Sequence, residues 1–107
     1  MFHADLDPTR GSQQRGTRPA LVVSDEEFNQ AMPNVTILPL TATSRGLYPA
    51  EVVLPAGAAG QPRPSIVMAH QVRTVGKERL GRLYGYLEDS ALRAAVEAAI
   101  REHFDLA

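Results

Sequence analysis

Short apolar runs separated by glycine- and proline-rich connectors constrain this 107-residue chain more than any other feature. Residues 20–24 and 35–40 are rich in aliphatic and β-branched side chains and are too short for core helices, so both are predicted to be strands. Pro39 cannot donate to a neighbouring strand, so we expect it at an edge, an end or a bulge. Further strands are predicted at 1–5, 50–54, 65–69 and 71–75. The last two form either one long strand or two.

The hydrophobic period changes near the end of the chain. Five side chains recur at helical spacing: Leu92, Val96, Ala99, Ile100 and His103. This spacing predicts one amphipathic helix, capped by Asp89 or Ser90. The connector at 55–64 is expected to be mobile. Several strands followed by one helix predict an all-β barrel with a helix packed against it, in a single domain spanning residues 1–107.

Charge is balanced over the whole chain but not along it. Lys and Arg number 11 and Asp and Glu 12, for a formal charge of −1. This balance excludes a globally basic nucleic-acid binder and a highly charged disordered chain. Residues 1–24 and 62–82 carry +1 and +4, whereas residues 25–61 and 83–107 carry −3 each. All but one of the basic residues are Arg, which binds phosphate and carboxylate bidentately, although a GC-rich genome also explains that bias.

Several kinds of site are excluded by composition. The chain has no Cys, which removes disulfides, thiolate metal sites and cysteine nucleophiles. Its three His are scattered without the spacing of a metal site, so no metal or other cofactor is expected. No apolar run approaches the roughly 18 residues of a membrane span, and the first residues do not resemble a signal peptide. We therefore expect a cytoplasmic protein without membrane contact.

The polar segment at 7–19 lies between two predicted strands and carries Arg10, Arg15 and Arg18. Arginines beside amide side chains can bind phosphates and read bases. A solvated hairpin loop has the same composition. The chemistry of the residues alone leaves both interpretations open.

The order of the residues in this segment resembles the opening of the MazF/PemK-type toxins. Residues 5–24 (DLDPTRGSQQRGTRPALVVS) are similar to the family pattern D-x-D-P-T-x-G-(S or H)-E-Q-x-G-x-R-P followed by an apolar strand. Four later segments resemble family motifs in the same order: Phe28-Asn29, 38–43 (LPLTAT), 48–54 (YPAEVVL) and 70–75 (HQVRTV). Each match is weak alone, but together they span nearly the whole chain.

The resemblance implies a mainly β fold with a C-terminal α-helix, an SH3-like antiparallel β-barrel of the CcdB/MazF-like type, working as a homodimer. It implies a toxin of a type II toxin–antitoxin system that inhibits translation and growth. Such a toxin is a metal-independent endoribonuclease, which cleaves single-stranded RNA by 2′-hydroxyl attack to a 2′,3′-cyclic phosphate. A cognate antitoxin is expected to block the RNA groove with an acidic, extended segment, and DNA is expected to be contacted only through that antitoxin.

The resemblance also implies the site residues. In MazF-type enzymes the catalytic pair is the Arg before Pro and the Thr of the P-x-T step, which correspond to Arg18 and Thr41. Arg18 would stabilise charge on the phosphoryl oxygens, and the Thr41 hydroxyl would contact the phosphate or orient the 2′-hydroxyl. The alternatives are an ion pair of Arg18 with Glu51 or Asp7, and a turn cap at Thr41. RNA contacts are expected from eight further residues: Arg10, Ser12, Gln13, Gln14, Thr43, His70, Gln71 and Arg73.

Two departures from the family pattern bear on activity. Gln13 and His70 stand where the family usually has Glu and Asp. His70 either serves as an acid or base or is a strand-end residue bonded to backbone. The family's Gly-Asp dipeptide before the first strand is missing, so Met1 is expected inside that strand.

The basic residues of the +4 segment also have two interpretations. They either track the RNA backbone or belong to a solvated strand and turn. The residues concerned are four of its five basic residues, namely Arg73, Lys77, Arg79 and Arg82. Two alternatives to an active nuclease remain: a gyrase-poison-type binding toxin of the same fold, and a catalytically weak member that binds the antitoxin.

Overall fold

A computed structural model describes the backbone of residues 3–8, 17–42, 46–81 and 83–106, with side chains in these ranges from Pro19 onward. The elements follow one another as β1 (His3–Pro8), β2 (Thr17–Val22), α1 (Glu26–Ala31), β3 (Asn34–Ala42), β4 (Glu51–Leu54), β5 (Ser65–Met68), the 3₁₀ turn η1 (Ala69–Gln71), β6 (Arg73–Gly76), the 3₁₀ turn η2 (Lys77–Arg79), β7 (Leu83–Tyr86) and α2 (Ser90–Phe104).

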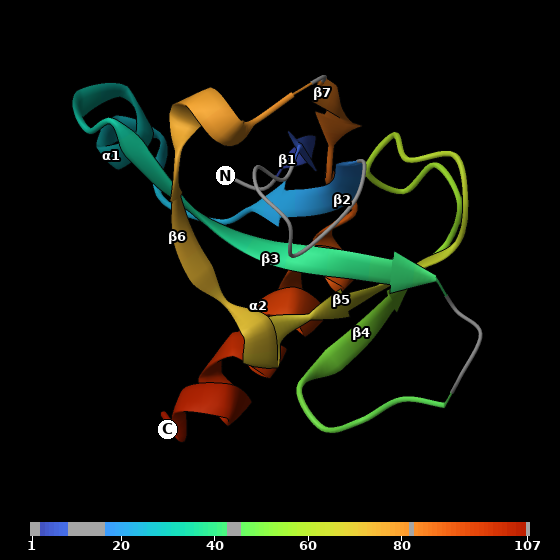
Figure 1. Cartoon of the computed structure of the whole chain (residues 1–107). Helices are drawn as coiled ribbons and strands as arrows, with labels where there is room; N and C mark the ends of the chain where they lie inside the picture. Colours follow the sequence, from blue (N-terminus) through green and yellow to red (C-terminus); the bar gives the residue numbers. More distant parts are fainter. Residues whose placement is uncertain (1–2, 9–16, 43–45, 82, 107) are drawn as a thin grey trace.

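The strands form one curled antiparallel sheet. Neighbouring strands follow the order β4-β5-β3-β2-β1-β7, and β6 pairs with β3. Figure 1 shows the sheet wrapping around the interior, with α2 packed below β3 and β5. The end strands β4 and β7 form no pairing with each other in the described part of the chain, so the sheet is barrel-like without closing. The predicted mainly β fold with a C-terminal helix is confirmed.

Strand β3 joins two parts of this sheet. Residues 34–37 of β3 pair with β6, and residues 40–42 pair with β5. Pro39 falls in the gap between these two pairings, opposite Ala20 of β2. A residue without an N–H is tolerated there, because neither β5 nor β6 pairs with it. The proline therefore lies at a break in the ladder within a strand, and not at either end of the strand.

The core explains why the apolar run of β2 is continuous. Leu21 has no exposed surface and packs in a cluster with Leu38 and Val96. Its neighbours Ala20 and Val22 belong to a second buried cluster on the opposite face. Successive strand residues point to opposite faces, so a strand buried on both sides shows no polar alternation.

Helix α2 covers the first cluster as its spacing predicts. Val96 and Ala99 are buried, and Leu92 and Ile100 pack against them, whereas His103 is exposed and does not belong to the buried face. Asp89 is the N-cap, because its Oδ1 accepts from the Leu92 N–H at 2.9 Å.

Two elements escaped the sequence analysis. Helix α1 spans only Glu26–Ala31, which is too short to show a helical period, although Asp25 caps it by accepting from Glu27 N–H. Strand β7 contains Gly85, which weakens a strand signal. The turn η1 resolves the other open question, because it divides residues 65–75 into the two strands β5 and β6.

Candidate active site

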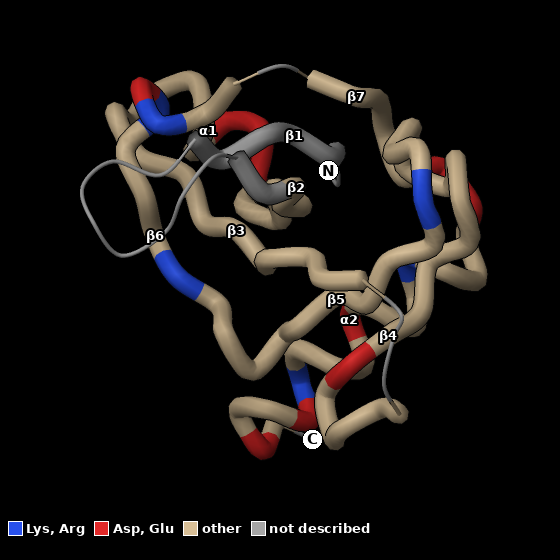
Figure 2. The backbone as a smooth tube through the Cα atoms, turned by 45° about the vertical axis from the view of Figure 1, so that its right-hand side comes forward, with Lys and Arg blue, Asp and Glu red and all other residues tan. Residues whose placement is uncertain are grey.

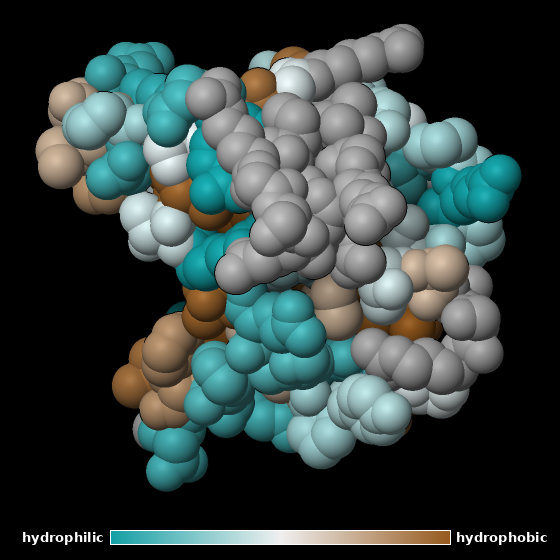
Figure 3. Space-filling view, in the orientation of Figure 1, coloured by the Kyte–Doolittle hydropathy of each residue, from teal (hydrophilic) through white to brown (hydrophobic). Residues whose placement is uncertain are grey.

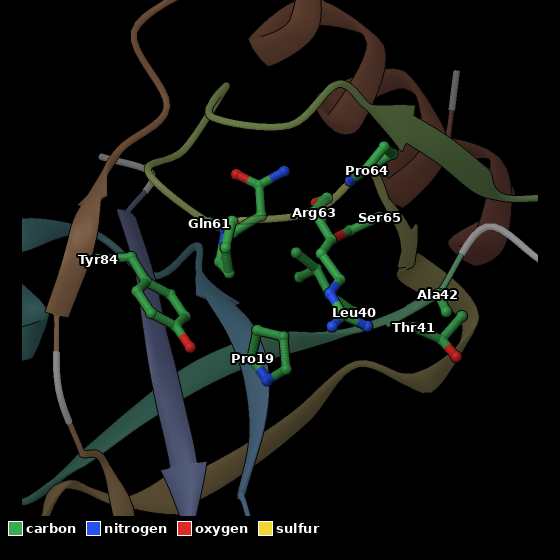
Figure 4. A pocket seen from close by; sticks show the side chains of 10 residues that line it. Pro19, Leu40, Thr41, Ala42, Gln61, Arg63, Pro64, Ser65 and Tyr84 are labelled. Carbon is green, nitrogen blue, oxygen red and sulfur yellow. Dashed lines mark hydrogen bonds between the residues drawn. The ribbon is translucent and has the colours of Figure 1, made fainter.

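Thr41 lies inside β3, near its end. The structure places it opposite Ile66 of β5 and half-buried, so a cap in a turn after the strand is not its role. Its side chain lines a pocket of about 480 Å³. Pro19 of β2 lines the same pocket (Figure 4).

Arg18 is placed by its backbone. It lies in β2, immediately before Pro19, and pairs across the ladder with Asp7 of β1. On its other side β2 pairs with β3, in the register Ala20↔Pro39, Leu21↔Leu38 and Val22↔Ile37.

The rest of the pocket comes from segments distant in sequence. β3 supplies Leu40, Thr41 and Ala42, β5 supplies Ser65, and β7 supplies Tyr84, while the connector before β5 supplies Gln61, Pro62, Arg63 and Pro64. In Figure 4 the Arg63 side chain extends from the connector toward β3 and ends between Pro19 and Thr41. The pocket therefore joins apolar walls to one guanidinium and three hydroxyl-bearing strand residues, Thr41, Ser65 and Tyr84.

Contrary to the expected mobility, the connector at 55–64 is held by hydrogen bonds. Gln61 is 1% exposed, its Oε1 accepts from the Ala59 N–H at 2.9 Å, and its Nε2 donates to the Pro55 carbonyl at 2.9 Å. The Gly57 N–H donates to the Gln61 carbonyl at 2.8 Å. Because both the oxygen and the nitrogen of this buried amide are hydrogen-bonded to residues of the same connector, the side chain holds the connector in one conformation.

Two glycines bring this connector against β7. A Cβ added at Gly60 would lie 2.3 Å from the Tyr84 carbonyl oxygen, and the φ of Gly60 is +87°. A Cβ at Gly85 would lie 3.1 Å from the Ala59 carbonyl oxygen. Only glycine permits this close approach, which fixes the pocket wall relative to Tyr84.

His70 lies away from this pocket. It belongs to η1, and its Nε2 atom contacts the Glu51 carboxylate, so the interpretation of a strand-end histidine bonded to backbone is wrong. Gln71 and Arg73 are exposed on η1 and β6, and neither they nor His70 line the pocket. Among the site residues predicted from sequence, Thr41 lines the pocket. Arg18 is adjacent in sequence to Pro19, which also lines it.

Five predicted RNA-contacting residues fall outside the described residues, namely Arg10, Ser12, Gln13, Gln14 and Thr43. Sequence reasoning missed Gln61, Arg63 and Tyr84. The +4 segment included Arg63, but charge alone does not distinguish an arginine aimed into a pocket from one on a solvated turn.

Positive charge is spread over the fold. Figure 2 shows basic positions on β6 and on the η2 turn after it, and acidic positions along α2. Figure 3 shows a mostly hydrophilic surface on the face seen in Figure 1, where hydrophobic residues emerge in separate places. Exposed hydrophobic side chains occur on both end strands of the sheet, at Val53 of β4 and at Leu83 and Tyr86 of β7.

Two absences concern metals and membranes. Among the side chains that the structure describes, which begin at Pro19 and omit residues 43–45, 82 and 107, no group of three or more His, Asp or Glu is arranged to hold a metal ion. Over the described backbone, no helix has the length and apolar character needed to cross a bilayer.

Comparison with known proteins places this geometry in context. A family model described as PemK-like, MazF-like toxin of type II toxin-antitoxin system matches residues 1–104. The chain is 33% identical over 111 residues to Endoribonuclease MazF9 of Mycobacterium tuberculosis, with 99% of this chain and 93% of that protein covered. The M. tuberculosis toxin MazF-mt6 superposes with a TM-score of 0.76 at 31% identity, with 99% and 97% of the two chains covered. The MazE-MazF crystal structure from Deinococcus radiodurans gives a TM-score of 0.77 at 25% identity, with 98% and 93% covered.

Proposed function

The chain belongs to the PemK-like, MazF-like toxins of type II toxin–antitoxin systems, and on this premise we propose that it is a metal-independent endoribonuclease acting through Arg18 and Thr41. The similar protein MazF9 is named an endoribonuclease and is matched over nearly its whole length. Cleavage of messenger RNA by such an enzyme inhibits translation and growth.

The register of β2 and β3 is the observation that carries the assignment of the catalytic pair. The paired residues run from Val22↔Ile37 to Ala20↔Pro39. We extend this register by two residues beyond the last pair, which sets the backbone of Arg18 opposite that of Thr41. Directly opposed residues of an antiparallel pair are close neighbours on one face of a sheet. In this proposal both residues contact the same phosphodiester group.

RNA supplies its own nucleophile for this reaction. The 2′-oxygen attacks the adjacent phosphorus, the bond from phosphorus to the 5′-oxygen breaks, and a 2′,3′-cyclic phosphate remains on the 5′ fragment. The 2′-hydroxyl loses its proton to water, and the leaving 5′-oxygen takes one from water. The enzyme must align these atoms and stabilise charge on the phosphoryl oxygens. The forked donors of Arg18 suit the charge, and the Thr41 hydroxyl suits the alignment. A guanidinium holds its proton too tightly to act as a base, so Arg18 is a poor candidate for proton abstraction.

RNA contacts beyond the pair are proposed on the surrounding loops and on η1 and β6. The contacts assigned to the segment from 10 to 14 and to Thr43 follow from their family motifs. Gln71 and Arg73 are exposed on η1 and β6, where RNA could contact them, while the Nε2 of His70 contacts Glu51. The +4 charge of residues 62–82 favours a polyanion.

A homodimer, a cognate antitoxin and a cytoplasmic location complete the proposal. Both end strands expose hydrophobic side chains, at Val53 and at Leu83 and Tyr86, and a second copy would cover such edges. The structurally similar toxin from D. radiodurans was solved as MazE-MazF, which supports an antitoxin partner here. An acidic, extended antitoxin segment would compete with RNA for the basic groove and would supply any DNA contact.

Cleavage of a long RNA in EDTA tests the proposal. The wild-type protein should cut it, whereas Arg18→Ala and Thr41→Val should each cut about 10²–10³ times more slowly, the cost of losing one fixed donor. Replacing the 2′-hydroxyl at the cleaved nucleotide by hydrogen should abolish cutting. Ser90→Ala removes an exposed hydroxyl from the start of α2, outside the pocket; it is the control and should cut normally.

Each outcome discriminates between the alternatives. Equal cutting by the wild type and Arg18→Ala would overturn the catalytic assignment. No cutting by the free wild-type protein, combined with tight binding to a small co-expressed partner, would favour the catalytically weak member. The endoribonuclease name of MazF9 weighs against the gyrase-poison-type toxin.

A further inference from the structure

The backbone around Arg63 is fixed from both sides. Pro62 and Pro64 flank it, and the Arg63 carbonyl accepts from the Ser65 Oγ at 2.9 Å. Ser65 is buried at the start of β5. Proline locks its own φ and restricts the residue before it, so the backbone of Arg63 is restricted before any ligand arrives.

The Arg63 guanidinium is directed into the pocket, and no carboxylate is among the described residues that line it. Figure 4 shows it ending between Pro19 and Thr41. Within the described ranges, no hydrogen bond or ion pair of this side chain is found. A guanidinium carries five donors in a planar fork that matches the oxygens of a phosphate. The donors that Arg63 presents are therefore available to an anionic ligand.

The remaining walls suit a flat, apolar group. Pro19, Pro62 and Pro64 line the pocket, and Tyr84 lies across Pro19 from Arg63 in the view of Figure 4. A volume of about 480 Å³ lies in the range of small-ligand sites, which is roughly 300–1,000 Å³. Single-stranded RNA presents unstacked bases that pack on aromatic rings, with a phosphate beside each base.

We infer that this pocket is a subsite for one nucleotide of the RNA substrate, in which Arg63 binds a phosphate and Tyr84 packs against the base. The inference rests on the proposed endoribonuclease function and names part of its substrate-binding surface. Thr41 lines both the subsite and the proposed catalytic centre, so the nucleotide held here lies next to the cleaved bond.

The loop geometry supports a preformed subsite. Gln61 anchors the connector internally, and Gly60 sets it against the Tyr84 backbone. Arg63, which would bind the phosphate, and Tyr84, which would pack against the base, therefore lie on opposite sides of a pocket whose backbone is held in place. A site that is already ordered loses less conformational entropy on binding.

Binding to an RNA that cannot be cut separates this inference from catalysis. The probe is a mixed-sequence single-stranded RNA with 2′-O-methyl groups throughout, titrated at several salt concentrations. Arg63→Gln should raise its Kd about 10- to 100-fold, as expected for lost hydrogen bonds to a charged group. It should also reduce the salt slope by about 0.7, the value for one phosphate contact on a single strand. Arg63→Lys should restore the salt slope.

Tyr84 and a control arginine complete the design. Tyr84→Leu should raise the Kd about 5- to 100-fold through lost stacking, whereas Tyr84→Phe should have a smaller effect. Arg101→Gln removes one positive charge from the exposed end of α2, outside the pocket, and should leave the Kd within about twofold. Equal denaturation midpoints would establish that all variants are folded.

The outcomes distinguish a failure of the subsite inference from a failure of the proposed endoribonuclease function. If Arg63→Gln and Tyr84→Leu bind like Arg101→Gln while Arg18-dependent cutting persists, the subsite is wrong and the proposed function stands. If the wild type does not cut but both variants bind RNA more weakly, the subsite stands as an RNA-binding site and the nuclease proposal falls.

Discussion

The Nε2 atom of His70 lies 2.6 Å from the Oε2 atom of Glu51, whose side chain has no exposed surface. The other carboxylate oxygen, Oε1, accepts from the Tyr48 N–H at 3.0 Å. This pair ties η1 to the first residue of β4. A buried carboxylate needs such partners, because removing it from water without them carries a large free-energy cost.

The His70–Glu51 contact predicts a measurable coupling. His70→Ala should lower the free energy of unfolding by about 1–3 kcal/mol, because it removes one hydrogen-bonding partner of a buried carboxylate. Glu51→Gln should also destabilise. The double variant should lose less than the sum of the two single losses, by about 0.5–3 kcal/mol. Urea unfolding of the four proteins measures this cycle.

The control for this cycle is His103→Ala. His103 is exposed on the last turn of α2 and should change stability by no more than about 0.5 kcal/mol. Strict additivity of the His70 and Glu51 losses would show that the contact contributes no stability.

Two glycines of the connector at 55–64 should differ in how much stability is lost when each is replaced by alanine. Gly57 and Gly60 both have positive φ, at +84° and +87°. An added Cβ meets nothing within 4 Å at Gly57, but lies 2.3 Å from the Tyr84 carbonyl at Gly60. Gly57→Ala should cost about 1–2 kcal/mol from backbone strain alone. Gly60→Ala should cost about 1–3 kcal/mol more, since the connector must move away from β7.

Unfolding midpoints of the two alanine variants give the difference directly. Because Tyr84 lines the pocket, Gly60→Ala should also weaken RNA binding, whereas Gly57→Ala should not. Similar losses of stability in both variants would contradict the close packing of the connector on β7.

Asp89 and Ser90 are both candidates for the N-cap of α2 from the sequence, and the structure distinguishes them. Asp89 accepts from the Leu92 N–H, whereas Ser90 is the first helical residue. Asp89→Ala should cost about 1 kcal/mol through loss of the cap. Ser90→Ala should change stability by no more than about 0.5 kcal/mol. Thermal unfolding followed by circular dichroism measures both, and equal losses would refute the assignment of the cap.

The elements that could be predicted are those with a strong local signal. The apolar run of β2 and the helical spacing of Leu92, Val96 and Ala99 depend on neighbours in sequence, and both were found. Helix α1 and strand β7 were missed because six residues make less than two helical turns and because glycine interrupts a short strand.

By itself the sequence determined the mainly β class, the terminal helix and the family. Each of these depends on residue types at fixed local spacing, which a linear chain preserves. The pair Arg18 and Thr41 follows from the family resemblance and stays a prediction. Only the tertiary structure decided that Gln61 anchors the connector, that Arg63 is directed toward Thr41, and that Glu51 pairs with His70. These contacts join segments separated by a turn or by whole strands, and burial and direction at such contacts are properties of the packed chain alone.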